Sequence, residues 1–112
     1  MAYSRDLELY RYGTPFPLPG VRSVGWLDDT HPFPTGDVPP QVPRLLRGLA
    51  LTLPVNQMRG FHTCELCGQD WRRREDALRL LGSAEIWLKT ASGYWAAPDL
   101  IIHYIEDHRY RP

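Results

Sequence analysis

The distribution of proline constrains the fold of this chain more than any other feature of its sequence. Nine of the eleven prolines lie between Pro15 and Pro54. Each proline fixes φ and removes a backbone N–H donor, so long regular elements are disfavoured through most of this half. Apolar residues such as Val21, Trp26 and Phe33 alternate with the prolines, which argues against disorder. With 112 residues, the chain can bury one modest core, and we expect one domain.

The proline-rich half contains three segments that are typical of short regular elements. Residues 6–12 alternate leucine with acidic residues, which predicts a half-buried strand, and residues 21–27 predict a second strand. Asp37 can cap a helix of about three turns whose first turn contains Pro39 and Pro40. The residues expected on its buried face are Val42, Leu45, Leu46 and Leu49.

The second half predicts a turn, a hairpin and a final helix. Residues 84–89 and 94–97 are strand-like and are separated by four residues that can form a hairpin loop. Residues 76–81 can form a brief helical turn. Pro98 suits the first position of the final helix, and its expected apolar face contains Leu100, Ile101, Tyr104 and Ile105. The fold class is therefore α+β, a small domain with short antiparallel strands and two main helices.

Cys64 and Cys67 carry the clearest chemical signal in the sequence. Their spacing, Cys-Glu-Leu-Cys followed by Gly68, is typical of a zinc knuckle, in which backbone N–H groups turn toward thiolate sulfur. The alternatives are a redox pair and two incidental cysteines. A redox pair of the thioredoxin kind requires a βαβ context, which this sequence does not predict. We therefore expect zinc as the cofactor.

Histidines must complete a zinc sphere that has only two cysteines. His62 lies two residues before Cys64 and points to the same side in an extended chain. His103 and His108 have zinc-finger spacing, but residues five apart diverge by about 140° on an ideal helix, so both bind one metal only if the helix loosens before His108. The expected ligands are Cys64, Cys67, His103 and His62, with His108 as the alternative fourth ligand. The alternative for His103 is a solvated position beside Asp99 and Asp107, whose carboxylates can orient an imidazole. The alternative for His108 is a buried imidazole or one that caps the end of the helix.

Three further features have a functional and a simpler interpretation. Glu85 is either a solvent-facing strand residue or, if the metal site is open, the general base for a zinc-bound water. The run of Arg72, Arg73 and Arg74 beside Trp71 is either a nucleic-acid contact or a solvated loop. Residues 28–31, Asp-Asp-Thr-His, offer acid–base groups, although an Asx turn explains them more simply.

Charge and hydropathy exclude several classes of protein. The 13 basic and 13 acidic residues balance, which argues against nucleic-acid binding as the main role. No apolar run is long enough to span a bilayer, and the first residues lack the pattern of a signal peptide. We expect a cytoplasmic protein without membrane contact.

Two resemblances extend this interpretation. The order of Cys-x-x-Cys-Gly, hairpin and ligand-bearing helix from Cys64 to His108 resembles the treble-clef arrangement of zinc modules. The segments GWLDDTHPFPTG, RGFHTCELC, GSAEIW and APDLIIHYI resemble a group of short uncharacterised bacterial proteins, mostly actinobacterial. The first resemblance implies folding that zinc stabilises, and neither implies an activity. The expected organisation is a single zinc-binding domain over 1–112, in which 63–109 forms the knuckle, hairpin and helix and the proline-rich 1–62 packs against it.

The functional hypothesis that follows is a small protein with a structural zinc site that acts through a protein partner or as a homodimer. The first alternative is a small zinc-dependent hydrolase or lyase that uses Glu85 as general base. The weaker alternative is nucleic-acid binding through Arg72, Arg73 and Arg74.

Overall fold

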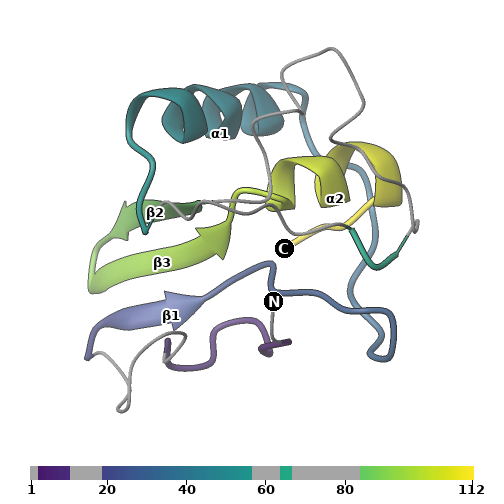
Figure 1. Cartoon of the computed structure of the whole chain (residues 1–112), viewed down its shortest axis with the longest axis horizontal. Coiled ribbons are helices and arrows are strands. Elements are labelled where there is room, and N and C mark those ends of the chain that lie inside the picture. The colour runs from purple at the N-terminus through teal and green to yellow at the C-terminus, as the bar shows by residue number, and fades with distance from the viewer. Residues whose placement is uncertain (1–2, 11–18, 57–63, 67–83) are drawn as a thin grey trace.

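A three-stranded sheet and two helices make up the regular structure of the described residues. The structure is a computed structural model, and it describes residues 3–10, 19–56, 64–66 and 84–112. The elements are β1 (Val21–Ser23), α1 (Gln41–Thr52), β2 (Glu85–Thr90), β3 (Gly93–Pro98) and α2 (Ile101–His108), as labelled in Figure 1. The strand order is β1-β3-β2, and this mixture of helices and sheet confirms the α+β class.

The hairpin of β2 and β3 forms the antiparallel half of the sheet. Glu85 pairs with Pro98 at one end and Thr90 pairs with Gly93 at the other, so residues 91 and 92 make the turn. The predicted hairpin is confirmed, with a loop two residues shorter than expected. Pro98 ends β3 rather than beginning the helix. This is possible because Pro98 is at the end of the strand, where a missing N–H interrupts the ladder least.

β1 adds to β3 in parallel and is shorter than the sequence predicts. Val21 pairs with Tyr94 and Ser23 with Ala96, and Gly25 follows with φ +78°. That left-handed conformation ends the strand, so residues 24–27 continue as buried irregular chain.

The strand predicted over residues 6–12 is wrong in the part that the structure describes. Leu7 has φ +66°, and residues 6 and 7 form a turn. The Glu8 carboxylate accepts hydrogen bonds from the Ser4 hydroxyl and the Arg5 N–H, which stabilises that turn. The described part of this segment still lies against β1, through an isolated antiparallel bridge between Leu9 and Arg22 and a hydrogen bond from the Tyr10 N–H to the Val21 carbonyl, but it forms no strand. Local side-chain bonds have therefore outweighed the alternating pattern.

The predicted helix of three turns is confirmed as α1, but its cap and its buried face differ from the prediction. Pro40 is the N-cap residue and makes no side-chain cap bond. The Asp37 carboxylate instead accepts a hydrogen bond from Arg109 at 3.2 Å. Leu46 is buried as predicted, whereas Leu45 is 63% exposed. Pro43 takes the buried position, so the helix is rotated away from the face that the leucine spacing indicated.

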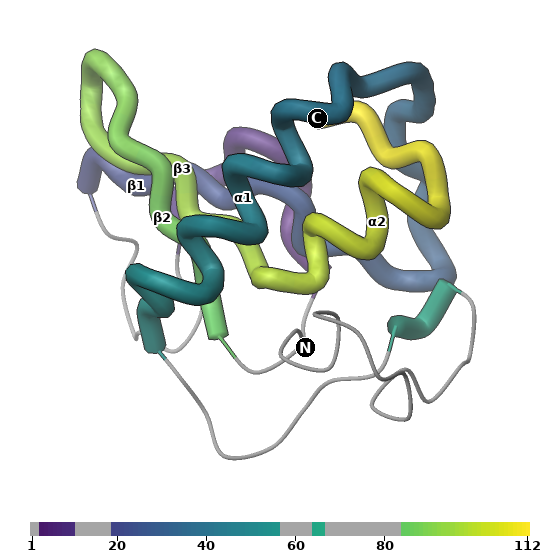
Figure 2. The backbone as a smooth tube through the Cα atoms, turned by 90° about the horizontal axis from the view of Figure 1, so that it is seen from above, coloured from purple at the N-terminus to yellow at the C-terminus, as the bar shows by residue number. Residues whose placement is uncertain are grey.

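α2 forms the centre of the core. All five residues from Ile101 to Ile105 are buried, including His103. Figure 2 shows α2 beside α1, which also packs against β2. Arg47 on α1 donates two hydrogen bonds to Glu106 on α2, at 2.8 and 3.0 Å, and this bidentate pair joins the exposed edges of the two helices.

The end of the chain is fixed to its beginning. The Tyr110 hydroxyl donates a hydrogen bond of 2.8 Å to the Asp6 carboxylate. Burial of the ring, together with the charge of Asp6, raises the pKa of Tyr110, so the hydroxyl stays protonated and keeps donating. Among the described residues, no helix has the length and apolar character required to cross a membrane.

Candidate metal site

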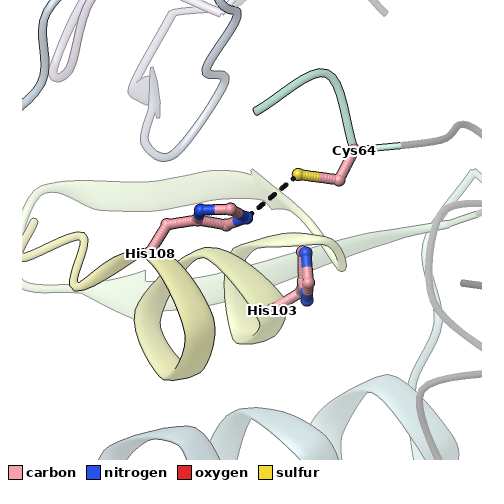
Figure 3. Close-up of side chains that lie close together, drawn as sticks. All are labelled: Cys64, His103 and His108. Carbon is pink, nitrogen blue, oxygen red and sulfur yellow. Dashed lines mark hydrogen bonds between the residues drawn. The ribbon is translucent and has the colours of Figure 1, made fainter. Parts of the chain in front are cut away.

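Three side chains with metal-binding atoms converge at the end of α2. Cys64 comes from a separate segment of the chain, and His103 and His108 come from the helix (Figure 3). The Sγ of Cys64 lies 3.4 Å from the Nε2 of His108, and the ligand atoms of all three residues lie within 4.8 Å of one another. Cys64 and His103 are buried, and His108 is half-buried. Among the described residues, this is the group that could hold a metal ion.

The end of α2 explains why His103 and His108 meet. Arg109 is in the left-handed conformation, and its N–H bonds the carbonyl of Tyr104, five residues back. The usual helical bond reaches four residues back, so the last turn is wider than an α-helical turn. Residues five apart lie closer to one side in such a turn. The two rings are accordingly 4.9 Å apart at an interplanar angle of 83°.

The divergence expected for His103 and His108 on a regular helix therefore does not occur. That divergence is why the sequence alone ranks His108 behind His62, with loosening of the helix before His108 as the condition for both helical histidines to bind. α2 stays helical through His108 and its widened turn closes at Arg109, so the two rings meet without a loosening of the helix before His108. His62 and Cys67 lie outside the described residues, so both remain predictions as ligands.

His103 has the orientation of a metal-binding imidazole. Its side chain is 1% exposed, which contradicts the alternative of a solvated position on the flank of the helix. Its Nδ1 lies 2.7 Å from the carboxylate of Asp107, one turn later. A carboxylate at Nδ1 stabilises the tautomer whose proton is on Nδ1, and it leaves the Nε2 lone pair for a metal. Of the two carboxylates expected near His103, Asp107 has this role.

The geometry of the group fits zinc. With Zn–S near 2.3 Å and Zn–N near 2.0–2.1 Å, a tetrahedral sphere separates a sulfur from a nitrogen ligand by about 3.5 Å. The distance from Cys64 to His108 is 3.4 Å. One thiol and two imidazoles are ligands that borderline-soft Zn²⁺ prefers over the oxygen ligands of Ca²⁺ and Mg²⁺. The donor set and the separation of Cys64 from His108 are therefore both compatible with zinc.

Glu85 is buried rather than solvent-facing. Its carboxylate accepts hydrogen bonds from the Tyr10 hydroxyl at 2.9 and 3.0 Å, the Trp87 indole N–H at 2.9 Å and the Asn56 amide at 3.2 Å. Trp87 lies two residues along β2 on the same face as Glu85, whereas Tyr10 and Asn56 are distant in the sequence, and the alternating pattern of β2 gave no means of finding them. Glu85 is not part of the group formed by Cys64, His103 and His108, and its catalytic role remains an untested prediction.

Residues 28–31 form the Asx turn that the simpler interpretation predicts. The Asp28 carboxylate accepts hydrogen bonds from the backbone N–H groups of Thr30 and His31, at 3.2 and 3.1 Å. The same carboxylate lies 2.8 Å from the His31 ring. Desolvation tends to raise the pKa of Asp28, but the hydrogen bonds from His31 and Thr30 outweigh it, and the pKa is lowered. Arg72, Arg73 and Arg74 lie outside the described residues.

Comparison with known proteins identifies the family of this chain. A family model described as a domain of unknown function, DUF7919, matches residues 2–112. The chain belongs to this family. No curated protein and no solved structure matches it. DUF7919 membership confirms the resemblance to a family of uncharacterised proteins and supplies no activity, so a function must be inferred from the site itself.

Proposed function

We propose that this protein is a small zinc-binding domain in which the metal is structural and is held by Cys64, Cys67, His103 and His108. The convergence of Cys64 with both histidines of α2 is the observation that carries the proposal. Cys67 enters from its sequence spacing, since Cys-x-x-Cys places a second thiolate one turn from the first. The proposal replaces His62 by His108, because His108 Nε2 lies 3.4 Å from the Cys64 sulfur.

Burial supports a structural rather than a catalytic metal. Cys64 belongs to the hydrophobic core cluster that also contains Ile102 and Tyr110. Four protein ligands leave no coordination position for water, whereas catalytic zinc keeps one open. The carboxylate of Glu85, the one candidate base, is already bonded to Tyr10, Trp87 and Asn56. No observation on the described residues favours the hydrolase or lyase alternative.

A structural metal is also what a core of this kind requires. Cys64 and α2 are far apart in the sequence. The helices and strands of the described residues are short. A bound zinc joins these segments directly, and metal-binding free energy becomes folding free energy when the site does not exist in the unfolded chain. Structural zinc in finger peptides contributes about 10–16 kcal/mol at pH 7.

The domain is proposed to act through a protein partner or as a homodimer. Support comes from large apolar side chains that the described structure leaves exposed. They are Leu7 near the start of the chain, Leu45 and Leu51 on α1, Leu53 at its end, and Tyr94 and Trp95 on β3. Exposed aromatic and aliphatic side chains of this size are enriched at protein interfaces.

Metal content of matched histidine variants tests the proposal. His103→Ala and His108→Ala are each expected to lose most of the zinc found in the parent protein, purified without chelator and measured by elemental analysis. His31→Ala is the control, because His31 is exposed and bonded to Asp28 outside the group. Zinc in the parent and in all three variants alike would refute this ligand set. A parent without any transition metal would refute the function.

A further inference from the structure

A groove between α1, the end of α2 and the segment before α1 carries a second inference, independent of the metal. Its volume is about 900 Å³, and it opens between residues 36–40, the first half of α1 and the end of α2. That volume falls within the roughly 300–1,000 Å³ of sites for small molecules. None of Cys64, His103 and His108 lines the groove.

The groove has an apolar floor and a charged rim. Val38, Pro40, Pro43 and Ile105 supply the apolar part of its lining. The charged part consists of three guanidinium groups and two carboxylates, and it therefore has an excess of one positive charge. These residues are Arg44, Arg47, Arg109, Asp37 and Glu106.

The three arginines differ in how strongly they pair with the two carboxylates. Arg47 and Glu106 form a bidentate pair, as described above. Arg109 makes a single bond of 3.2 Å to Asp37, and both side chains are largely exposed. Arg44 lies one turn before Arg47 and makes no ion pair with another described residue. An exposed single ion pair is worth about 0–1 kcal/mol, so an incoming anion can displace Asp37 from Arg109 at little cost.

We propose that this groove binds a phosphate monoester with an apolar substituent. Arg44 and the Arg109 released from Asp37 provide two positive charges, which match the charge of a phosphate dianion. Arginine suits this role because its planar fork donates two parallel hydrogen bonds to phosphate oxygens. The apolar floor then covers the substituent, and Arg47 stays paired with Glu106.

Titration of the full chain with phenyl phosphate, followed by NMR, tests this proposal. At about pH 8 the phosphate is dianionic, since its second pKa is about 6. We expect saturable shifts at residues of the groove with a Kd below about 1 mM, and a Kd at least tenfold higher for inorganic phosphate and for benzoate. Benzoate binding as tightly as phenyl phosphate would overturn the preference for a dianion.

Single substitutions locate the site and separate it from general attraction between charges. Arg44→Ala and Arg109→Ala are each expected to raise the Kd at least tenfold, and Asp37→Asn is expected to lower it severalfold by removing the competing carboxylate. Arg22→Ala on β1 is the control, because Arg22 is exposed and does not line the groove. The site would be refuted if Arg22→Ala raised the Kd as much as Arg44→Ala and Arg109→Ala do. It would also be refuted if the parent protein showed no saturable binding. All titrations use the parent protein as purified and variants whose melting temperature equals that of the parent, so the outcome does not depend on whether the protein holds zinc.

Discussion

Asp107 determines how His103 can bind a metal. Its carboxylate lies 2.7 Å from Nδ1 of His103 and is 40% exposed, while the imidazole itself is buried. The charge is therefore close to the ring and still solvated, which favours a proton on Nδ1 without the cost of a buried carboxylate. In the proposed site, this pair fixes the orientation of the His103 ring independently of the metal.

Asp107→Ala is expected to weaken zinc binding by about 10–100-fold, which is the usual effect of removing such an orienting carboxylate. Glu106→Ala is the control, because Glu106 neighbours Asp107 but pairs with Arg47 on α1. Competition with a chromophoric chelator measures both affinities. With Co²⁺ bound, the visible spectrum of Asp107→Ala should differ from that of the parent protein, whereas the spectrum of Glu106→Ala should not. Identical affinities for the two variants would show that Asp107 does not orient the ligand.

We expect the domain to lose a small part of its stability in acid because of Asp28. Its pKa is lower in the folded chain than its ordinary value, so the unfolded chain takes up the proton at a higher pH. Asp28 therefore contributes to the free energy of unfolding at pH values above its ordinary pKa. This contribution is lost as the pH falls through the pKa of Asp28 in the folded chain. Asp28→Asn should lower stability near neutral pH and flatten the acid limb of the denaturation curve. An acid limb that coincides with that of the parent protein would contradict this assignment.

At the scale of the elements, the turn of the hairpin depends on a close approach to β1. Gly93 has φ +152°, and a Cβ at this position would collide with the carbonyl oxygen of Gly20. The same carbonyl accepts the N–H of Tyr94 at 2.8 Å, so the two strands cannot separate without losing that bond. Gly48 in α1 differs, because its Cβ would meet nothing within 4 Å.

Alanine substitutions at Gly93 and at Gly48 provide a matched comparison. Gly93→Ala is expected to destabilise the domain by roughly 2–4 kcal/mol, through the backbone clash and the positive φ. Gly48→Ala is expected to stabilise it by about 0.5–1 kcal/mol, because alanine has the higher helix propensity and lowers the entropy of the unfolded chain. Chemical denaturation measures both. Equal effects of the two substitutions would contradict the approach of Gly93 to Gly20.

The elements differ in how far their sequence predicts them. The hairpin and both helices follow from short-range patterns, and these predictions are confirmed. The turn at Leu7 and the exposure of Leu45 depend on local side-chain bonds and on how α1 rests against its neighbours, which periodicity does not encode. The widened turn that closes at Arg109, directly after His108, is likewise a property of the folded chain.

The candidate site was only partly predictable for the same reason. Cys64 and His103 have spacing and residue types that indicate a metal, whereas the ranking of His108 required the geometry of the end of α2. The environment of Glu85 required knowledge of Tyr10 and Asn56, which are distant in the sequence. Long-range contacts of this kind decide between a solvent-facing and a buried carboxylate, and the alternation of a single strand does not contain them.

For the whole molecule, the account predicts that folding and metal binding share one free energy. Chelation of the metal by EDTA should lower the free energy of unfolding by several kcal/mol, since structural zinc in finger peptides contributes about 10–16 kcal/mol. Cys64→Ser should melt at the same temperature with and without EDTA, and below the parent protein. A parent protein with unchanged melting temperature in EDTA, after loss of its metal, would show that the ion is dispensable for the fold.

The coordination sphere itself is the most direct test of the central claim. X-ray absorption at the zinc edge of the purified protein should count two sulfur and two nitrogen ligands, at about 2.3 and 2.0–2.1 Å, and should not change when thiol or hydroxamate ligands are added. That result would agree with a closed site formed by both cysteines and both histidines of α2. Three protein ligands with an exchangeable water, or no transition metal at all, would contradict it.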